Sequence, residues 1–420
     1  TKNYEKIMLL GDKAIRAEEK LTRIYPQKNL FSHIIGQIDN ENSGISGIEK
    51  SFNEELKLIK EPLRLTLDTD LQFLIRLELL KFQEIFRAKG SAAILMNVNN
   101  GEILAMISLP DFDLNKRQTI KDVNYINRVT KGTYELGSVF KTFTIASGIN
   151  EGLIDTNTEF LDSKKDISCG KNHSISEYDD EMPSDLTVEQ ILVRSGNIGS
   201  VRIIRKIGVE KHKSFLKTIG ILDKINFDIE EIGKPQKIDW HEGCKLETIS
   251  FGHGITTTIL QLAKGYSIIT NGGYDIKPTL IKANLDKNYK GKKILKNNVS
   301  KKVNLILRKV VVEGTAKQVN VKGYQVGGKT GTAQQARDKK YSNIKINTLA
   351  SIFPISDPKY ALVVMMESPK TASEYVYKYR HKEGSYKGSP FNTAGWTSVE
   401  AAGQIIEKIG PILATKYLEN

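Results

Sequence analysis

The sequence has 420 residues, of which 39% are hydrophobic and 26% are charged, and its formal net charge is +13. This composition fits a globular protein of about two to three domains. No apolar run approaches the roughly 18 residues that cross a membrane, and the lysines are spread along the chain instead of clustering beside aromatic residues, so a nucleic-acid partner is not indicated.

The first 62 residues differ in pattern from the rest of the chain. Tyr4–Tyr25 is predicted to be a charged amphipathic helix, and a glycine-rich stretch follows it as far as Gly47. Pro62 marks a plausible boundary. We therefore predict an N-terminal region at 1–62 and a main domain at 63–420.

The main domain is predicted to begin with a strand, a helix and a hairpin. Leu63–Leu67 alternates as a strand does, and Thr69 with Gln72 forms a capping-box pattern that starts a helix. Two apolar runs, Ala92–Val98 and Glu102–Ser108, are joined by an Asn-Asn-Gly turn and predict a β-hairpin.

The first chemical motif is S-x-x-K, formed by Ser138 and Lys141 at the start of a predicted helix at about Ser138–Ile149. A serine needs an adjacent base to act as a nucleophile, and positions i and i+3 share one helix face. A lysine is a base only when neutral, and burial and a second cation, here Lys329, both lower its pKa. Alone, the motif also fits a helix cap and a solvated lysine.

The second motif is S-x-N, at Ser195 and Asn197. A capping box at Thr187 starts a helix, which the motif interrupts, so the motif is predicted to lie at a turn between two helices. Ser195 would relay a proton between Lys141 and a leaving amine, and Asn197 would hold Lys141 or the amide carbonyl of a substrate. Alone, the three residues also fit an ordinary turn.

The chain has two cysteines, Cys169 and Cys244, which are too few for a framework of several disulfides. One bridge is possible, but we expect two separate thiols in preference to it. The histidines show no metal-ligand spacing, and although His241 lies near Cys244, no second pair completes a zinc site. No metal or cofactor is predicted.

Helices and then strands dominate the rest of the chain, and a last helix starts with a capping box at Thr397 and ends at Gly410-Pro411. This order predicts an α+β fold with a mostly antiparallel sheet built from both ends of the chain, which brings Lys329 next to Ser138. The predicted elements are helices at Lys211–Ile219 and Thr257–Asn271 and strands at Tyr324–Thr332, Asn347–Phe353 and Lys359–Met366.

The third motif is K-T-G, at Lys329, Thr330 and Gly331, followed by Thr332. A glycine inside a strand often marks the close approach of another backbone, so a peptide substrate would lie along this strand. The backbone N–H groups of Thr332 and Ser138 would form an oxyanion hole. Lys329, Thr330 and Thr332 would bind a substrate carboxylate. The alternative is a surface strand edge with a turn.

Together and in this order, the three motifs resemble those of the class B penicillin-binding proteins, and most closely the division-specific (septal) peptidoglycan D,D-transpeptidases. The resemblance implies a penicillin-binding-protein/serine β-lactamase-like domain with flanking helices, a helical subdomain and a small N-terminal pedestal remnant. His253 lies in a structural segment of that family. The resemblance extends to residues 33–36, 44–49, 127–128, 134–137, 250–255 and 314–316.

The resemblance implies that Ser138 is acylated by stem peptides ending in D-Ala-D-Ala and by β-lactams. It also implies a divisome glycosyltransferase and other division proteins as partners. The expected location is the periplasmic face of the bacterial inner membrane, with an anchor in an N-terminal segment absent from this chain.

Three alternatives stay open: an elongation-specific class B transpeptidase, a serine β-lactamase and a non-enzymatic β-lactam sensor. Two motif residues depart from the family pattern. Gly196 stands where the S-x-N motif more usually has Ser or Asp, and Val139 stands where the S-x-x-K motif frequently has Thr. A class A β-lactamase needs a further glutamate to activate water. No E-x-x-L-N-like segment that would supply this glutamate lies between Asn197 and Lys329.

Overall fold

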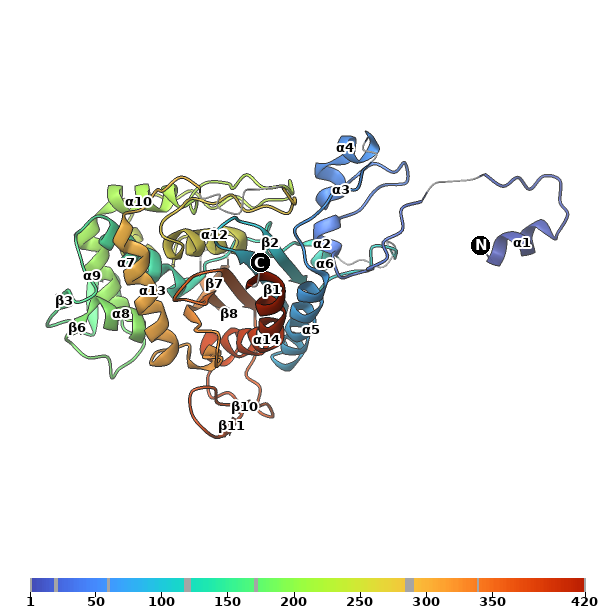
Figure 1. Cartoon of the computed structure of the whole chain (residues 1–420). Helices are drawn as coiled ribbons and strands as arrows, with labels where there is room; N and C mark the ends of the chain where they lie inside the picture. Colours follow the sequence, from blue (N-terminus) through green and yellow to red (C-terminus); the bar gives the residue numbers. More distant parts are fainter. Residues whose placement is uncertain are drawn as a thin grey trace.

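The structure is a computed structural model that describes residues 2–18, 22–58, 61–116, 122–169, 173–283, 291–337 and 340–418. No helix in these ranges is long and apolar enough to cross a membrane. The molecule consists of a central sheet between two helical layers, with the N-terminal segments at one side (Figure 1).

The central sheet has five antiparallel strands in the order β2-β1-β9-β8-β7. Ala93 of β1 pairs with both Ile107 of β2 and Val364 of β9, so the first and last thirds of the chain form one sheet, as predicted. The strands are β1 Gly90–Asn97, β2 Ile103–Leu109, β7 Gly327–Arg337, β8 Lys340–Phe353 and β9 Tyr360–Glu367.

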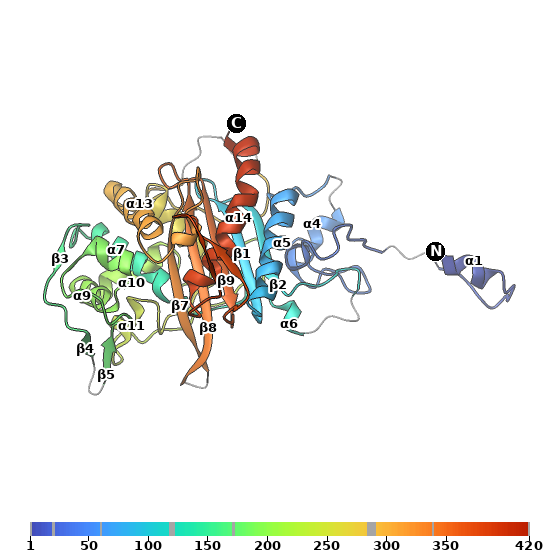
Figure 2. The same ribbon diagram turned by 90° about the horizontal axis from the view of Figure 1, so that it is seen from below.

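Helices bury both faces of this sheet. Helices α5 and α14 pack on one face, and α12 and α13 pack on the other (Figure 2). All residues of β2 and β9 are buried, which explains why these strands are continuous apolar runs and do not alternate. The bounds are α5 Thr69–Ile85, α12 Ile259–Thr270, α13 Asn297–Val312 and α14 Ser398–Leu413.

A helical subdomain lies beyond α13, on the side of the sheet away from α14 (Figure 2). It contains two small two-stranded sheets, one formed by β3 with β6 and the other by the hairpin of β4 and β5. Its elements are α7 Phe140–Asn150, β3 Glu159–Phe160, β4 Asp166–Cys169, β5 His173–Ser176, β6 Leu186–Thr187, α8 Val188–Arg194, α9 Asn197–Ile207, α10 Val209–Thr218 and α11 Lys245–Ile249.

The N-terminal helix is much shorter than expected, so the prediction of a helix over Tyr4–Tyr25 is wrong. Helix α1 ends at Met8, and Gly11 has a φ of +65°, which lies outside the helical region. The remaining short elements are α2 Ser32–Ile35, α3 Gly47–Ser51, α4 Asn53–Leu58, α6 Asp122–Tyr125, β10 Val376–Lys378 and β11 Ser385–Lys387.

Three local predictions in the main domain are also wrong. Leu63–Leu67 forms only a single bridge, between Leu65 and Ile281. The cap of α5 is Asp68, not Thr69, because the Asp68 carboxylate accepts the backbone N–H groups of Asp70 and Leu71 in the first turn. Thr397 stands at the N-cap position of α14, but no capping box forms, because its hydroxyl donates to the carbonyl of Thr393.

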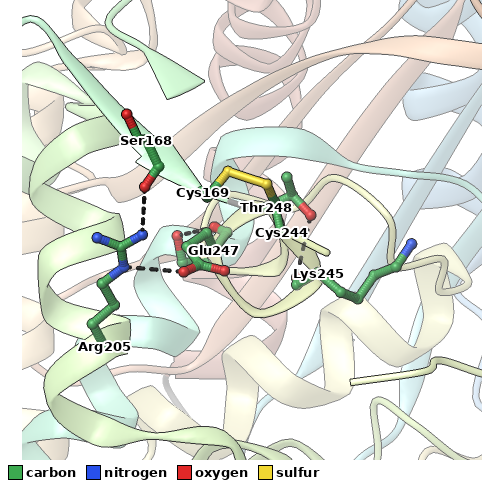
Figure 3. Close-up of a disulfide and its surroundings, with 8 residues drawn as sticks. Ser168, Cys169, Arg205, Cys244, Lys245, Glu247 and Thr248 are labelled. Carbon is green, nitrogen blue, oxygen red and sulfur yellow. Dashed lines mark hydrogen bonds and ion pairs between the residues drawn. A yellow bond between two sulfur atoms is a disulfide. The ribbon is translucent and has the colours of Figure 1, made fainter. Parts of the chain in front are cut away.

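The two cysteines form a disulfide, so the expectation of separate thiols is wrong (Figure 3). Cys169 ends β4 and Cys244 directly precedes α11, 75 positions later, with their Cα atoms 5.3 Å apart. Sequence spacing carries no information on this pairing, because only the fold brings these segments together.

Candidate active site

The three sequence motifs meet in one cleft between the sheet and the helical subdomain, with a volume of about 520 Å³. Ser138 comes from the start of α7, Ser195 and Asn197 from the turn between α8 and α9, and Thr330 and Thr332 from β7. The other lining residues are Tyr178, Phe251, His253, Thr315, Lys345, Thr393, Gly395 and Trp396.

Ser138 lies in a tight 3-10 turn, Gly137–Val139, that leads directly into α7. Ser138 is half-buried, whereas Leu136, Val139 and Phe140 around it are buried and fix the turn in the core. The placement at a helix N-terminus agrees with the sequence prediction, and backbone N–H groups there favour developing negative charge.

Strand β7 packs directly against this turn, at the edge of the sheet. A Cβ added at Gly331 would lie 2.1 Å from the carbonyl oxygen of Leu136, and one added at Gly137 would lie 2.9 Å from that of Thr332. The glycine of K-T-G is therefore required by the approach of the Ser138 turn, a constraint that the sequence analysis assigned to a substrate instead. This contact brings the backbone of Thr332 beside that of Ser138.

Lys141 is completely buried and donates three hydrogen bonds to the S-x-N turn. Its Nζ bonds the carbonyl of Ser195, the Ser195 Oγ at 3.3 Å and the Asn197 Oδ1 at 2.8 Å. Within the described ranges no hydrogen bond joins Lys141 to Ser138, although the spacing predicts that the two side chains meet. Such contacts often tighten only when substrate is bound.

Lys329 is also completely buried, and its Nζ donates to the Ser195 Oγ at 2.9 Å and to the carbonyl of Thr330 at 3.0 Å. The ammonium groups of Lys141 and Lys329 therefore share one hydroxyl. Ser195 is the point where all three motifs are connected.

The pKa of Lys141 is lowered to about 7, mainly because burial disfavours the charged amine, while the carboxylate of Glu177 opposes this shift. Burial also lowers the pKa of Lys329 well below its ordinary value, and the charge of Lys141 lowers it further. Burial thus has the largest effect on both amines, and the expectation that the charge of Lys329 lowers the pKa of Lys141 is wrong, because Lys141 lowers the pKa of Lys329 instead.

The pH dependence of acylation should follow from this pKa. Above pH 7 Lys141 is mostly neutral and able to accept a proton; below pH 7 it is protonated and cannot. We expect the rate constant for acylation by penicillin to level off above about pH 7 and to fall about tenfold per pH unit below it. Stopped-flow measurement from pH 5 to 9 checks this. A rate that does not change over this range would contradict it.

Glu177 supports the S-x-N turn and was missed by the sequence analysis. Its carboxylate accepts the backbone N–H groups of Asn197 and Ile198, both at 2.8 Å, at the N-terminus of α9. Negative charge is favoured at this end of a helix. No sequence signal identifies Glu177, because it lies in a loop 20 positions before Asn197.

Residues from the C-terminal part of the chain complete the cleft and were also missed. The backbone N–H of Ala394 donates to the Thr332 Oγ1 at 3.0 Å, which joins the segment that contains Trp396 to β7. Thr315 shares a hydrogen bond of 2.7 Å with Thr330. Thr315 lies in the segment 314–316, which carries part of the resemblance, whereas the segment around Trp396 has an ordinary sequence context. In both cases only the fold shows that the residues line the cleft.

His253 lines the cleft, but its pKa is lowered to about 4 by burial and by the charge of Lys141, so the ring is neutral at pH 7. It follows Gly252, where an added Cβ would lie 2.1 Å from the carbonyl oxygen of Gly137. The segment thus packs against the Ser138 turn.

Across the described ranges no three His, Cys, Asp or Glu residues form a group that could hold a metal ion.

Comparison with protein families gives a match over residues 91–390 to the model described as penicillin binding protein transpeptidase domain. The probable peptidoglycan D,D-transpeptidase FtsI of Caulobacter vibrioides is 28% identical, over 98% of this chain and 69% of that protein. Stage V sporulation protein D of Bacillus subtilis is also 28% identical, over 88% of this chain and 64% of that protein. This chain therefore spans roughly two thirds of the length of these relatives.

The fold is similar to that of solved penicillin-binding proteins. The apo structure of penicillin binding protein 3 from Mycobacterium tuberculosis gives a TM-score of 0.77 at 22% identity, covering 93% of this chain and 91% of that one. The TP domain of penicillin-binding protein 3 from Burkholderia pseudomallei gives a TM-score of 0.71 at 22% identity, covering 83% of this chain and 96% of that one. The α+β fold class predicted from the sequence is confirmed.

Proposed function

The chain belongs to the penicillin-binding protein transpeptidase family, and we propose that it is a class B peptidoglycan D,D-transpeptidase that cross-links stem peptides through an acyl-enzyme on Ser138. The observation that carries this proposal is the buried pair of lysines at one hydroxyl, beside an accessible serine at a helix N-terminus. An amine with a pKa of about 7 is suited to accept a proton at neutral pH.

In the first step, the Ser138 Oγ attacks the carbonyl carbon of the penultimate D-Ala, and its proton passes to the neutral amine of Lys141. The negative charge that develops on the carbonyl oxygen is stabilised by the backbone N–H groups of Ser138 and Thr332. Asn197 holds Lys141 through the hydrogen bond of 2.8 Å.

Collapse of this intermediate breaks the peptide bond and releases D-Ala. The leaving nitrogen takes a proton from Lys141 by way of the Ser195 hydroxyl, which both lysines contact. In the second step, an acceptor amine attacks the ester and loses a proton to Lys141, and the Ser138 Oγ regains a proton as it leaves.

The edge strand β7 would bind the peptide. Among the described residues no strand pairs with its outer edge, so an extended stem peptide is able to add to it. The hydroxyls of Thr330 and Thr332 line the cleft and would bind the terminal carboxylate. Lys329 is buried beneath them, and its amine donates a hydrogen bond to the carbonyl of Thr330.

We further propose a division role, with anchoring at the periplasmic face of the inner membrane and with a glycosyltransferase and other division proteins as partners. Its support is the similarity to proteins named FtsI from Caulobacter vibrioides and Escherichia coli, at 28% and 27% identity. The sporulation protein has the same identity, 28%, over 88% of this chain instead of 98%, so sequence identity alone does not separate these roles. Depletion in the source cell is expected to give filaments, and rounded cells would favour the elongation role instead.

Turnover assays test the enzymatic proposal. Incubation with a fluorescent penicillin should give one adduct, on Ser138, that persists for many minutes. With a thioester analogue of D-Ala-D-Ala, the acyl group should be transferred to an added D-amino acid. Intact mass spectrometry follows both reactions. An adduct that clears within seconds would favour a β-lactamase, and a stable adduct without any transfer would favour a sensor.

A further inference from the structure

The Cys169–Cys244 disulfide lies directly behind one wall of the active-site cleft. Cys169 belongs to a small buried cluster that is separate from the main core and includes Ile198 of α9 and Phe251. Ile198 follows Asn197, and Phe251 lines the cleft. The bridge therefore adjoins the residues that support the candidate site.

One half of the disulfide anchors the hairpin formed by β4 and β5. Within the part of the chain that the structure describes, these two strands pair only with each other, and an isolated two-stranded hairpin is marginally stable. Asp166 pairs with Ser176 and Cys169 with His173, so the bridge fastens the far end of the same hairpin that leads into Glu177.

The near end of this hairpin holds Asn197 in place by three hydrogen bonds. The side-chain amide of Asn197 donates to the carbonyl of Ser176 at 3.1 Å. The carboxylate of Glu177 accepts the backbone N–H groups of Asn197 and Ile198. Asn197 in turn accepts the hydrogen bond from Lys141. A chain of contacts thus runs from the hairpin to the proposed base.

The other half of the disulfide is attached to the support of Ser138. Cys244 precedes α11, which leads to Gly252 at the carbonyl of Gly137. The carbonyl of Ser250, at the end of α11, accepts the hydroxyl of Thr144 on α7 at 2.9 Å. The bridge consequently joins the support of Asn197 to the support of the nucleophile.

We propose that the Cys169–Cys244 disulfide is a redox-sensitive brace that positions Asn197, and through it Lys141, relative to Ser138. A dithiol opens the bridge by thiol–disulfide exchange. Two electrons and two protons pass to the cysteines, which become thiols, and the dithiol becomes a cyclic disulfide. This proposal rests on the proposed function, because it concerns the rate at which Ser138 is acylated.

The effect of opening the bridge should be partial, because a second connection remains. Arg205 of α9 donates to the carbonyl of Ser168 at 2.9 Å and to the Glu247 carboxylate at 3.0 Å, so it joins the same two segments without a covalent bond (Figure 3). We expect reduction to lower the acylation rate constant about tenfold, within the range of typical coupling between sites.

A pH profile separates positioning from simple destabilisation. The charged or titratable groups around Lys141 are Glu177, Lys329 and His253. Of these, Glu177 favours the protonated amine, and it follows the braced hairpin. If the hairpin loosens, Glu177 moves away and the pH midpoint of acylation falls. A loss of folded protein lowers the amplitude of acylation and leaves this midpoint unchanged.

The test compares the oxidised protein, the protein reduced with dithiothreitol and then freed of it, and the Cys169→Ser/Cys244→Ser double variant. The readouts are the acylation rate constant with a fluorescent penicillin at pH 5–9, the active fraction and the thermal midpoint. We expect the reduced protein and the double variant to share a rate about tenfold lower and a lower pH midpoint. Dithiothreitol treatment of the double variant, the matched control, should change nothing.

A Glu177→Gln variant tests the route of the coupling. If the brace acts through Glu177, reduction should change the rate less in this variant than in the wild type. An unchanged acylation rate in the reduced wild type would overturn the brace, even if the thermal midpoint falls. Failure of the oxidised protein to be acylated at all would instead overturn the proposed function.

Discussion

Replacement of Ser138 with alanine is expected to remove all covalent labelling by penicillin, with no other change in the protein. The Oγ is the proposed nucleophile, and no neighbouring hydroxyl in the cleft occupies its position at the start of α7. The side chain is half-buried and alanine keeps its Cβ, so the free energy of unfolding should change by less than about 1 kcal/mol. Intact mass spectrometry and thermal unfolding measure both quantities.

Ser147→Ala is the matched control for this prediction. Ser147 lies on the same helix, is fully buried, and its hydroxyl has no hydrogen-bond partner in the described part of the chain. Its loss should leave labelling at the wild-type level. Equal labelling of Ser138→Ala and the wild type would refute the assignment of the nucleophile.

The second large effect is expected for Lys141→Met, which keeps a side chain of similar length but removes the amine. Without the proposed base, the acylation rate constant should fall by roughly 100- to 10,000-fold, the usual contribution of a general base. The inflection near pH 7 should also disappear, because the group that titrates there is gone. A pH series of acylation rates measures both changes.

Lys211→Met, at an exposed position on α10, is the control and should behave as the wild type. If Lys141→Met retained the inflection near pH 7, the titrating group would be another one, and Lys329 would be the next candidate. If it retained the full rate, the lysine-base mechanism would be wrong.

The chemical motifs could be predicted from the sequence because each is short and local. The i, i+3 spacing of Ser138 and Lys141 and the turn at Ser195 are set by neighbouring residues, and the structure brings these residues into one cleft with Thr332. The β1–β2 hairpin and most helices follow from local apolar patterns, and the order of the elements along the chain predicts a sheet built from both ends, but the order of the strands within that sheet comes only from the structure.

The rest of the site depends on contacts that no local pattern encodes. Glu177 and the Cys169–Cys244 bridge act between segments that are far apart in sequence, and neither has a distinctive context. The cap of α5 was misassigned because Asp68 and Thr69 are adjacent and both are good caps. The N-terminal helix is shorter than its charge pattern predicts, because Gly11 adopts a positive φ just after α1 ends.

The pairing of β1 with β9 has a consequence for how the protein is made. Ala93 of β1 is translated about 270 positions before Val364, its pairing partner in β9. At ordinary synthesis rates this delay lasts tens of seconds, and the apolar hairpin is without its sheet partner throughout. The unpaired hairpin is vulnerable to aggregation during this delay, and the candidate site is also incomplete for most of it, because β7 is translated only shortly before β9.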